Sequence, residues 1–396
     1  MRTESARSCN VGDFRAAAQR KLPRGIFEFV DRGTEDDFSV RNNRDAFERI
    51  TLRPRVLRNV SVRSLEVELF GRKSAMPLAI APTGAAGLLW YEGEIAIARA
   101  AAAAGIPFTL STASITSMEK VARQAGGRLW FQLYMWPDQS MSHQLVRRAR
   151  DAGYEALIVT VDTAVTPNRE YNRRNGFAFP FTINRKNVSD VIRHPRWLVN
   201  VIGKYLLSSG MPRFENFPEE LRRSLVGPAD HRRGLPKNDS LTWDDLRTLR
   251  RLWTGPLMVK GILHPDDAML AADCGADAVI VSNHGGRNLD GSIAPLDALE
   301  EIAQRVGSKL TVMVDGGFQR GSDVVKALAL GAKAVFIGRG PLWGVAADGE
   351  RGASRVLTLF REEIDRVMGL MGSATVDAID RLSFQHSLPP PASPRR

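Results

Sequence analysis

The stretch AVIVSNHGGRNLDG, residues 278–291, begins as a buried strand and ends in polar and flexible residues. Its first four residues are apolar, and three of them are β-branched, which is typical of a strand inside a sheet. A serine, an asparagine, His284, two glycines and Arg287 follow at once. A core strand that stops on such residues predicts that its carboxyl end opens onto a functional site.

Seven further runs of this kind occur in the chain, and helical patterns separate most of them. All eight runs are almost continuously apolar, as expected of parallel strands that are buried on both faces. Strand and helix alternating eight times predict an α/β fold, a closed (β/α)8 TIM barrel, with a doubly wound open sheet as the alternative. The runs lie at 77–83, 107–112, 129–134, 156–162, 257–261, 278–285, 310–317 and 334–340.

Three segments fall outside this alternation. Residues 1–76 precede the first strand, and we expect an N-terminal helical extension that closes the bottom of the barrel or flanks its mouth. The barrel then spans 77–370. It carries a long insertion at 172–240, after strand four, which exceeds an ordinary connection between strand and helix. Residues 371–396 form a C-terminal tail that ends in the Pro-rich sequence SLPPPASPRR, for which we expect disorder.

Composition narrows the class of protein. The chain has 396 residues, 43% of them apolar, so it can bury a large core. Its two cysteines support neither a disulfide framework nor a cysteine metal site. The start of the chain lacks the apolar run of a signal peptide, and we expect a cytoplasmic protein. The net charge of +11 fits nucleic acid, an anionic membrane surface or small anionic substrates.

The insertion is basic and partly apolar. Its segment WLVNVIGKYLL (197–207) places a tryptophan and aliphatic residues beside lysine, which is typical of an amphipathic element on a bilayer surface. A solvated active-site lid is an equally good interpretation. The basic residues that outnumber its acids are Arg185, Lys186, Arg193, Arg196, Lys204, Arg213, Arg222, Arg223, Arg232, Arg233 and Lys237.

Polar side chains follow each of the eight predicted strands. In a barrel, the carboxyl ends of all strands meet at one mouth, where functional groups gather. Eight polar strand ends therefore predict one site rather than eight loops. They supply Pro82, Thr83, Gly84, Ser111, Thr112, Gln132, Tyr134, Thr160, Asp162, Lys260, His284, Arg287, Asp315, Gly316, Gly317, Gly338 and Arg339.

The last two strand ends predict a cofactor phosphate. Glycines there let backbone N–H groups approach an anion, and Arg339 adds charge. A buried Lys260 needs an electron-rich partner, and Ser111, Gln132 and Thr160 are the neutral hydrogen-bonding groups that a flavin ring requires. The G-x-G-x-x-G fingerprint of nicotinamide enzymes is absent.

The remaining mouth residues predict acid–base chemistry on a carboxylate. Asp162 can orient the imidazole of His284, which then acts as a base. Arg169 and Arg287 can hold a carboxylate in two-pronged contacts, and Tyr134 can donate a hydrogen bond to a substrate oxygen. Together with a redox ring, these groups describe the oxidation of a 2-hydroxy acid.

The motifs resemble, in order, those of the FMN-dependent 2-hydroxy acid dehydrogenases and oxidases, from about Asp13 to Gly369. APTG (81–84), LSTAS (110–114) and GMPRFENF (210–217) look most like the mandelate dehydrogenase branch, beside the lactate dehydrogenases. The other matching motifs are RAAAQRKLPRGIFEFVDRG (15–33), LWFQLY (129–134), VKGI (259–262), SNHGGRNLDG (282–291), RGSDVVKALALGA (320–332) and FIGRG (336–340).

The resemblance implies a role for each matching residue. His284 is the base and Asp162 its partner, whereas Phe29, Tyr134, Arg169 and Arg287 surround the substrate. It implies no metal. The residues implied around FMN are Pro82, Thr83, Gly84, Ser111, Gln132, Thr160, Lys260, Ser282, Asp315, Gly317, Gln319, Gly338 and Arg339.

Two positions depart from this pattern, and a third distinguishes the chain from glycolate oxidases. Phe29 stands where the family usually has a tyrosine whose hydroxyl touches the substrate carboxylate. Gln319 stands where it usually has an arginine near the phosphate. Ala113 occupies a position that is bulky and aromatic in glycolate oxidases, which leaves room for a larger substrate side chain.

We therefore expect FMN-dependent oxidation of a mandelate- or lactate-like L-2-hydroxy acid to the 2-oxo acid, with electrons passed to a quinone or other acceptor. The alternatives are an oxidase that uses O₂, a tailoring enzyme of a peptide-derived cofactor, and a barrel that serves only as a scaffold. We expect a homo-oligomer, a tetramer, that binds no nucleic acid. We also expect that it can sit peripherally on the inner face of the cell membrane.

Overall fold

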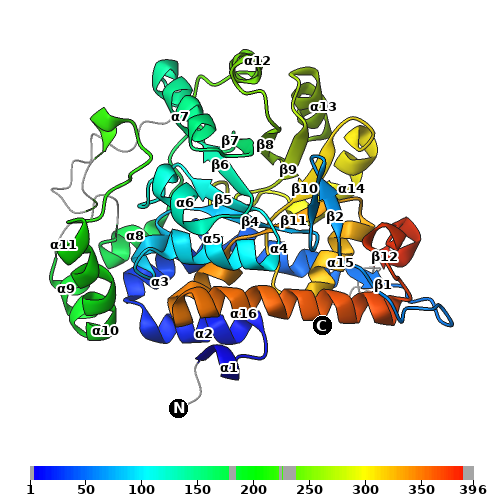
Figure 1. The fold of residues 1–396 in the computed structure, drawn as a ribbon, viewed down its shortest axis with the longest axis horizontal. Helices are drawn as coiled ribbons and strands as arrows, with labels where there is room; N and C mark the ends of the chain where they lie inside the picture. The colour runs from blue at the N-terminus through cyan, green and yellow to red at the C-terminus, as the bar shows by residue number, and fades with distance from the viewer. Residues whose placement is uncertain (1–3, 178–183, 223–224, 226–237, 387–396) are drawn as a thin grey trace, which may run out of the picture.

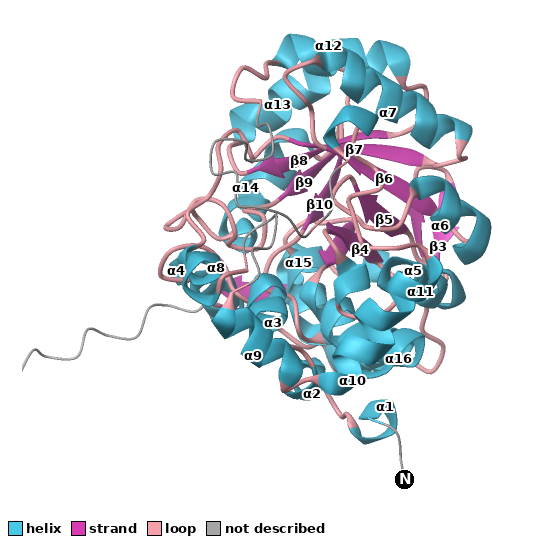
Figure 2. Ribbon diagram, turned by 90° about the vertical axis from the view of Figure 1, so that its left-hand side faces the viewer, coloured by secondary structure: helices cyan, strands magenta, loops and turns pink. Residues whose placement is uncertain are grey.

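The computed structural model describes residues 4–177, 184–222, 225 and 238–386. Eight parallel strands close into a barrel (Figures 1 and 2), which confirms the predicted TIM barrel and excludes the open sheet. Each predicted apolar run contains one strand. In order around the barrel these are β10 (Thr311–Val314), β11 (Ala334–Ile337), β4 (Leu78–Thr83), β5 (Phe108–Ser111), β6 (Leu129–Leu133), β7 (Ala156–Thr160), β8 (Leu257–Ile262) and β9 (Ala278–Val281).

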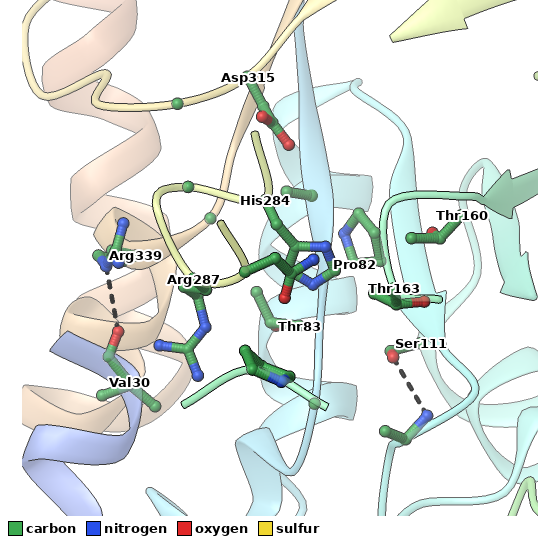
Figure 3. A pocket seen from close by; sticks show the side chains of 18 of the residues that line it. Val30, Pro82, Thr83, Ser111, Thr160, Thr163, His284, Arg287, Asp315 and Arg339 are labelled. Atoms are coloured by element: carbon green, nitrogen blue, oxygen red, sulfur yellow. Dashed lines mark hydrogen bonds between the residues drawn. The ribbon is translucent and has the colours of Figure 1, made fainter. Parts of the chain in front are cut away.

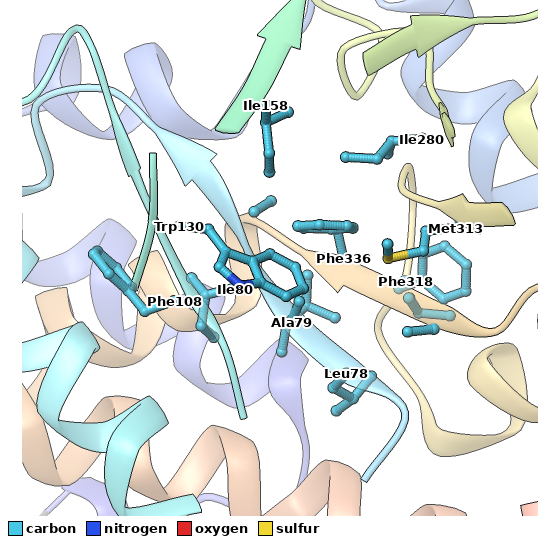
Figure 4. Packing of buried hydrophobic residues seen from close by; sticks show 14 of the residues in the cluster. Leu78, Ala79, Ile80, Phe108, Trp130, Ile158, Ile280, Met313, Phe318 and Phe336 are labelled. Atoms are coloured by element: carbon cyan, nitrogen blue, oxygen red, sulfur yellow. The ribbon is translucent and has the colours of Figure 1, made fainter. Parts of the chain in front are cut away.

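Side chains fill the barrel interior. Trp130 and Phe336 meet inside it with ring centroids 5.9 Å apart, and Ile80, Ile158 and Ile280 point into the same space (Figure 4). All five are at most 1% exposed. The interior is thus a packed core, and polar groups have room only where the strands end.

Helices surround the barrel, as the alternating pattern predicted. The longest, α16, changes direction at Asp348 and Gly349, whose backbone angles are not helical. The helices that follow the strands are α5 (Gly93–Ala104), α6 (Met118–Ala125), α7 (Gln139–Asp151), α12 (Trp243–Leu252), α13 (Pro265–Asp273), α14 (Pro295–Val306), α15 (Gly321–Ala329) and α16 (Arg339–Met371).

The N-terminal extension divides between the two ends of the barrel. It contains α1 (Glu4–Arg7), α2 (Val11–Lys21), α3 (Arg24–Asp31) and α4 (Phe38–Glu48), then β1 (Ile50–Leu52), β2 (Val67–Leu69) and β3 (Arg72–Ser74). Helices α3 and α4 flank the mouth. The β2–β3 hairpin lies at the bottom, where Arg128 at the start of β6 donates a hydrogen bond of 2.8 Å to the Leu69 carbonyl.

The insertion forms a helical layer beside the barrel. Its described elements are α8 (Glu170–Asn175), α9 (Arg185–Ile192), α10 (Pro195–Trp197), the π-helix η2 (Leu198–Gly203), α11 (Lys204–Ser208) and the 3-10 helix η3 (Glu219–Leu221). The indole of Trp197 donates to the Leu88 carbonyl at 2.7 Å, and the Tyr205 hydroxyl accepts from Glu92 N at 3.1 Å. These contacts fix the layer against the short helix η1 (Ala86–Leu88) and the start of α5.

Some sequence predictions fall outside the described residues. These are the basic residues Arg223, Arg232, Arg233 and Lys237 of the insertion and the Pro-rich end at 387–396. The part of the tail that is described returns to the barrel, where β12 (Phe384–His386) pairs with β1. Among the described residues, no helix combines the length and apolar character needed to cross a membrane.

Candidate active site

A cavity of about 840 Å³ lies at the carboxyl ends of the strands (Figure 3). In the view of Figure 3, Arg287 and Arg339 lie to the left of His284, and Thr160 and Ser111 lie to its right. The structure thus gathers residues from all eight strand ends. The predicted site residues that line the cavity are Phe29, Pro82, Thr83, Gly84, Ser111, Tyr134, Thr160, Arg169, Lys260, His284, Arg287, Asp315, Gly317, Gln319, Gly338 and Arg339.

His284 is presented by a sharp turn after β9. Its φ is 58°, and the two glycines that follow also have positive φ, so the chain reverses within three residues. Histidine is among the residues that tolerate this left-handed conformation. A side chain at Gly286 would lie 2.7 Å from the backbone nitrogen of Val40 in α4. The glycines therefore allow the turn to pack against the N-terminal extension.

Asp162 and Tyr134 hold the two ring nitrogens of His284. The Nδ1 atom lies 2.8 Å from Asp162 Oδ1, and Nε2 lies 3.5 Å from the Tyr134 hydroxyl. Asp162 does not line the cavity but stands behind the histidine. A carboxylate on Nδ1 fixes the proton there and leaves the Nε2 lone pair available at the cavity.

Electrostatics favours a neutral histidine beside an ionised aspartate. Burial lowers the pKa of His284, and the cations Lys260 and Arg169 lower it too, while Asp162 opposes them. Burial alone would raise the pKa of Asp162, but its attraction and hydrogen bond to His284, together with Lys260, bring it below the usual value. A lowered pKa favours the neutral imidazole, which is the form that can accept a proton.

Two arginines lie together beside the histidine. Arg169 Nε and Nη2 donate to the Arg287 carbonyl at 3.3 and 3.2 Å, and Arg287 Nη1 donates to the Arg32 carbonyl at 2.7 Å. Burial, followed by repulsion from Arg287, lowers the pKa of Arg169 to about 10. Two cations held together in a buried cavity form a site for an anion.

Phe29 takes a different contact from the tyrosine that the family pattern has at this position. The guanidinium carbon of Arg287 lies 5.4 Å from the centroid of the Phe29 ring. This cation–π contact orients Arg287 without offering a hydrogen bond to a ligand.

Lys260 is held by two oxygen atoms at the end of β8. Its Nζ donates to Ser282 Oγ at 2.7 Å and lies 3.0 Å from Asp315 Oδ2. Burial lowers the pKa of Lys260, but Asp315 and Asp162 outweigh it and raise the pKa above the usual value. Within the described chain, the second oxygen of Asp315 is buried without a hydrogen-bond donor. A ligand with a polar edge fits this place.

Ser111, Gln132 and Thr160 form a neutral chain on the opposite side. Ser111 Oγ donates to Gln132 Oε1 at 2.9 Å, and Gln132 Nε2 donates to Thr160 Oγ1 at 3.0 Å. Gln132, like Ser282, contacts lining residues rather than lining the cavity itself. These neutral side chains suit a flat ring whose edge carries both donors and acceptors.

The far end of the cavity is an anion cradle. A Cβ at Gly317, whose φ is 83°, would lie 2.7 Å from the Asn43 carbonyl, so only glycine fits between β10 and α4. Arg339 Nε donates to the Val30 carbonyl at 3.2 Å, and burial, followed by repulsion from Arg287, lowers the pKa of Arg339 to about 10. Among the residues that the structure describes, Arg339 donates only to the backbone oxygens of Val30 and Arg32, so no carboxylate there neutralises its charge.

Gln319 lies in this cradle with a cation that the sequence did not identify. Asp323 accepts from Gln319 N at 2.9 Å and from Arg44 Nη1 at 2.5 Å, and Arg44 also donates to the Gly317 carbonyl at 2.6 Å. Arg44 belongs to α4, whose place at the mouth no strand-end rule predicts. Its charge is paired with that of Asp323.

Aromatic residues of the cavity were also missed as site residues, among them Trp136, Phe214 and Phe217. Trp136 lies two positions beyond Tyr134, and Phe214 and Phe217 belong to the insertion, after its helix α11. The only sequence signal for the two phenylalanines is the motif GMPRFENF, which marks a branch but assigns no role.

The cavity fits FMN. It offers a glycine-lined cradle with Arg339 for a phosphate, a buried lysine for an electron-rich ring edge and a neutral hydrogen-bonding row for the rest of the ring. An orphaned oxygen of Asp315 is available to a ring donor. A barrel with these features and an Asp–His pair defines a flavin-dependent oxidoreductase.

The family is shown by comparison with known proteins. A profile of the FMN-dependent dehydrogenases matches residues 18–386, and the chain belongs to this family, with FMN as its cofactor. The chain is 43% identical to the (S)-mandelate dehydrogenase of Pseudomonas putida over 370 residues, which cover 93% of this chain and 92% of that protein. It is 40% identical to an L-lactate dehydrogenase of Pseudomonas syringae pv. syringae (strain B728a) over 373 residues, or 94% and 97% of the two chains.

A solved structure supports the same assignment. The crystal structure of a monotopic membrane protein, (S)-mandelate dehydrogenase, superimposes with a TM-score of 0.90 at 42% identity. The match covers 96% of this chain and 100% of that chain.

Proposed function

We propose that the protein oxidises a mandelate- or lactate-like L-2-hydroxy acid to the 2-oxo acid. The main observation is that His284, paired with Asp162, lines the same cavity as the half-buried arginines Arg169 and Arg287. A base next to a carboxylate site is what a 2-hydroxy acid requires, because its hydroxyl lies one carbon from its carboxylate. The names of the relatives support this class of substrate.

Residues on three sides of the cavity would hold FMN. Gly317, Gly338 and Arg339 would hold the phosphate, Lys260 one ring edge, and the row from Ser111 to Thr160 another. Bound FMN supplies the redox chemistry, since it takes up two electrons from the acid. The remaining predicted contacts are Pro82, Thr83, Gly84, Ser282, Asp315 and Gln319.

The arginines would bind and orient the acid. Burial, followed by repulsion from Arg287, lowers the pKa of Arg169, and a carboxylate between the two arginines would offset both effects. Tyr134 would hold a substrate oxygen, because burial, with Asp162 adding to it, raises the pKa of its phenol and keeps the hydrogen on the oxygen.

His284 would take the proton that the acid loses. Its Nε2 atom faces Tyr134 at 3.5 Å, so an oxygen held by Tyr134 lies next to the basic nitrogen. After proton transfer, Asp162 stabilises the imidazolium through the 2.8 Å contact to Nδ1. With this geometry, His284 could remove the proton either from the hydroxyl group or from the α-carbon of the acid.

The shape of the site favours an aryl or extended side chain. Ala113 stands where glycolate oxidases have a bulky aromatic residue, and Gly84 beside it has no side chain. A Cβ at Gly84 would lie 3.4 Å from the Cβ of Ala113, so the two residues are neighbours, and together they present little side-chain bulk. Phe29 offers no hydroxyl, and a neutral hydrogen bond contributes about 1 kcal/mol. Burying an aryl group contributes about 1.5–3 kcal/mol, which outweighs that loss.

The insertion would attach the enzyme to an anionic membrane surface. We call the residues Val188, Ile192, Val199, Leu206, Leu207 and Met211 the apolar stripe of the insertion. All are exposed, with Leu207 at 91%, and Arg185, Lys186, Arg193, Arg196 and Lys204 lie among them in sequence. Apolar and basic residues in one exposed layer suit the boundary between lipid headgroups and chains. We further propose that the enzyme attaches to the inner face of the cell membrane, passes its electrons to a quinone and forms a homo-tetramer.

Anaerobic titration of the purified protein tests the proposal. We expect a yellow protein whose flavin absorbance disappears on addition of (S)-mandelate or (S)-lactate, with one 2-oxo acid formed per flavin. Reoxidation by quinone without peroxide supports a dehydrogenase, and stoichiometric peroxide in air assigns an oxidase. A colourless protein that FMN cannot reconstitute, or a flavin that no 2-hydroxy acid reduces, would contradict the proposal.

A further inference from the structure

An aromatic cluster forms one wall of the cavity. The rings of Phe214 and Phe217 stack with centroids 4.6 Å apart at 23°, and Trp136 meets Phe217 edge-on at 5.1 Å. All three line the cavity, and each is at most 7% exposed. The nearby lining residues Met135 and Leu241 are apolar as well. We call Trp136, Phe214 and Phe217 the aromatic wall.

A buried asparagine fixes this wall to the loop after β5. Asn216, which is 0% exposed, accepts a hydrogen bond from Met118 N at 2.8 Å. Its amide donates to Ser114 Oγ at 2.6 Å and to the Thr116 carbonyl at 2.9 Å. Every polar atom of this side chain is thus used on one loop. Glu215 N adds a bond of 3.2 Å to the Ser114 carbonyl.

The fixed loop is the one that carries Ala113. The backbone N–H of Ala113 donates a hydrogen bond to Ser111 Oγ at 3.1 Å. The next residue, Ser114, is held by Asn216. On the other side, Tyr134 N donates to Thr112 Oγ1 at 3.2 Å, and Trp136 follows two residues later. The aromatic wall therefore adjoins the space above Ala113 and Tyr134.

We propose that the aromatic wall is the subsite for the side chain of the substrate and that it selects an aryl group. Phe214, Phe217 and Trp136 are the specificity-determining residues, and Asn216 is a positioning residue that sets their distance from Ala113. Aromatic rings attract a further ring in stacked or edge-on contact, whereas a methyl group fills little of this wall. The inference rests on the proposed function, because it assumes that the acid binds with its carboxylate at the arginines.

The insertion thereby has two separate roles. Its helical layer carries the exposed apolar stripe, and the segment after α11 contributes the rings of Phe214 and Phe217 to the cavity. A glycolate-type enzyme needs no such wall, since its substrate has no side chain. The aromatic wall thus explains how an insertion outside the barrel changes the acid that the barrel accepts.

Rapid mixing without oxygen tests the subsite in the FMN-loaded, full-length protein. The acid concentration that gives half-maximal flavin reduction is measured with (S)-mandelate and (S)-lactate. We expect Phe217→Leu and Phe214→Leu to raise this concentration for mandelate by about tenfold or more, as hydrophobic pockets respond to changes of this size, and to leave it within about threefold for lactate. Phe384→Leu, a buried phenylalanine in β12 outside the cavity lining, is the matched control and should change neither value.

Asn216→Asp tests the positioning residue. It keeps the acceptor for Met118 N and removes the two amide donations, so the wall shifts while its rings remain. We expect a higher half-saturating concentration of mandelate, an unchanged maximal rate of reduction and little change with lactate. An equal loss with both acids would show a purely structural role and overturn this assignment.

The outcomes distinguish the subsite from the proposed function. If neither acid reduces the wild-type flavin, both proposals fail. If both acids reduce it but the leucine variants keep the wild-type ratio between the acids, the subsite alone fails. If the variants slow only reoxidation by a soluble quinone, the wall belongs to the electron acceptor instead, which also overturns the subsite. A variant that has not folded is identified by its low FMN content and its slow reduction by lactate. In that case the milder substitution Phe217→Tyr is tested instead, and the ratio of the half-saturating concentrations of mandelate and lactate decides.

Discussion

The barrel mouth and the helical layer of the insertion differ in what they bury. At the mouth, charged groups are enclosed, with Lys260 only 3% exposed, and each is matched to an opposite charge or to hydrogen-bonding oxygens. In the insertion, aliphatic residues are exposed, with Ile192 and Val199 both at 65%. Chemistry needs polar groups held rigidly away from water, whereas attachment to a surface needs apolar groups held toward it. On our proposal, the two regions therefore serve separate purposes, the mouth for the reaction and the insertion for attachment to a membrane.

Removing the proposed base should cause the largest loss of flavin reduction and should leave the insertion and its membrane attachment unchanged. We expect His284→Ala to retain FMN and to slow flavin reduction by about 10²–10⁴-fold, the usual contribution of a general base. His386→Ala, an exposed histidine in β12, is the control. Stopped-flow absorbance measures both. Reduction of the His284→Ala flavin at the wild-type rate would remove the role assigned to His284.

Filling the space above the flavin site should change substrate preference within the mouth. Ala113→Trp is expected to lower kcat/KM for (S)-mandelate about 10- to 200-fold and to reverse the order of mandelate and glycolate, because the ring occupies the room left for an aryl group. Steady-state kinetics with both acids checks it. A wild-type enzyme that already prefers glycolate would refute the argument from size.

Charging the apolar stripe should affect location and leave the chemistry almost unchanged. We expect Leu206→Glu with Leu207→Glu to abolish flotation with anionic liposomes while flavin reduction stays within about twofold, since surface substitutions barely alter stability. Leu382→Glu, at an equally exposed leucine outside the insertion, should still float. Salt should weaken the wild-type binding. Undiminished flotation of the double variant would show that the stripe does not contact lipid.

Much of the mouth could be predicted from sequence because strand ends obey a simple rule. Apolar runs fix the strands, and closure of the barrel then brings the residues that follow them together. That rule located His284, Lys260 and Arg339 although they lie on different strands. Their roles came from chemistry and family resemblance, and those roles remain predictions.

The remainder could not be predicted because it depends on long-range docking. Arg44 reaches the Gly317 end of the cavity from α4, and its partner Asp323 lies 279 residues away. Asn216 anchors the insertion to a loop about a hundred residues earlier, a contact with no periodic pattern. The N-terminal extension was expected at either end of the barrel, and only packing shows helices at the mouth and a hairpin at the bottom.

The most direct test is the pH dependence of flavin reduction by (S)-mandelate in the wild-type enzyme. A neutral His284 must accept the proton, so the rate falls as pH drops through the pKa of His284. Burial lowers that pKa, and the fall should therefore lie below the ordinary histidine value of about 6.5, with a level rate from there to about pH 8. In His284→Ala, the rate of flavin reduction should no longer fall over this acidic range. A rate that falls already above about pH 7, or an acidic fall that persists in His284→Ala, would contradict the account.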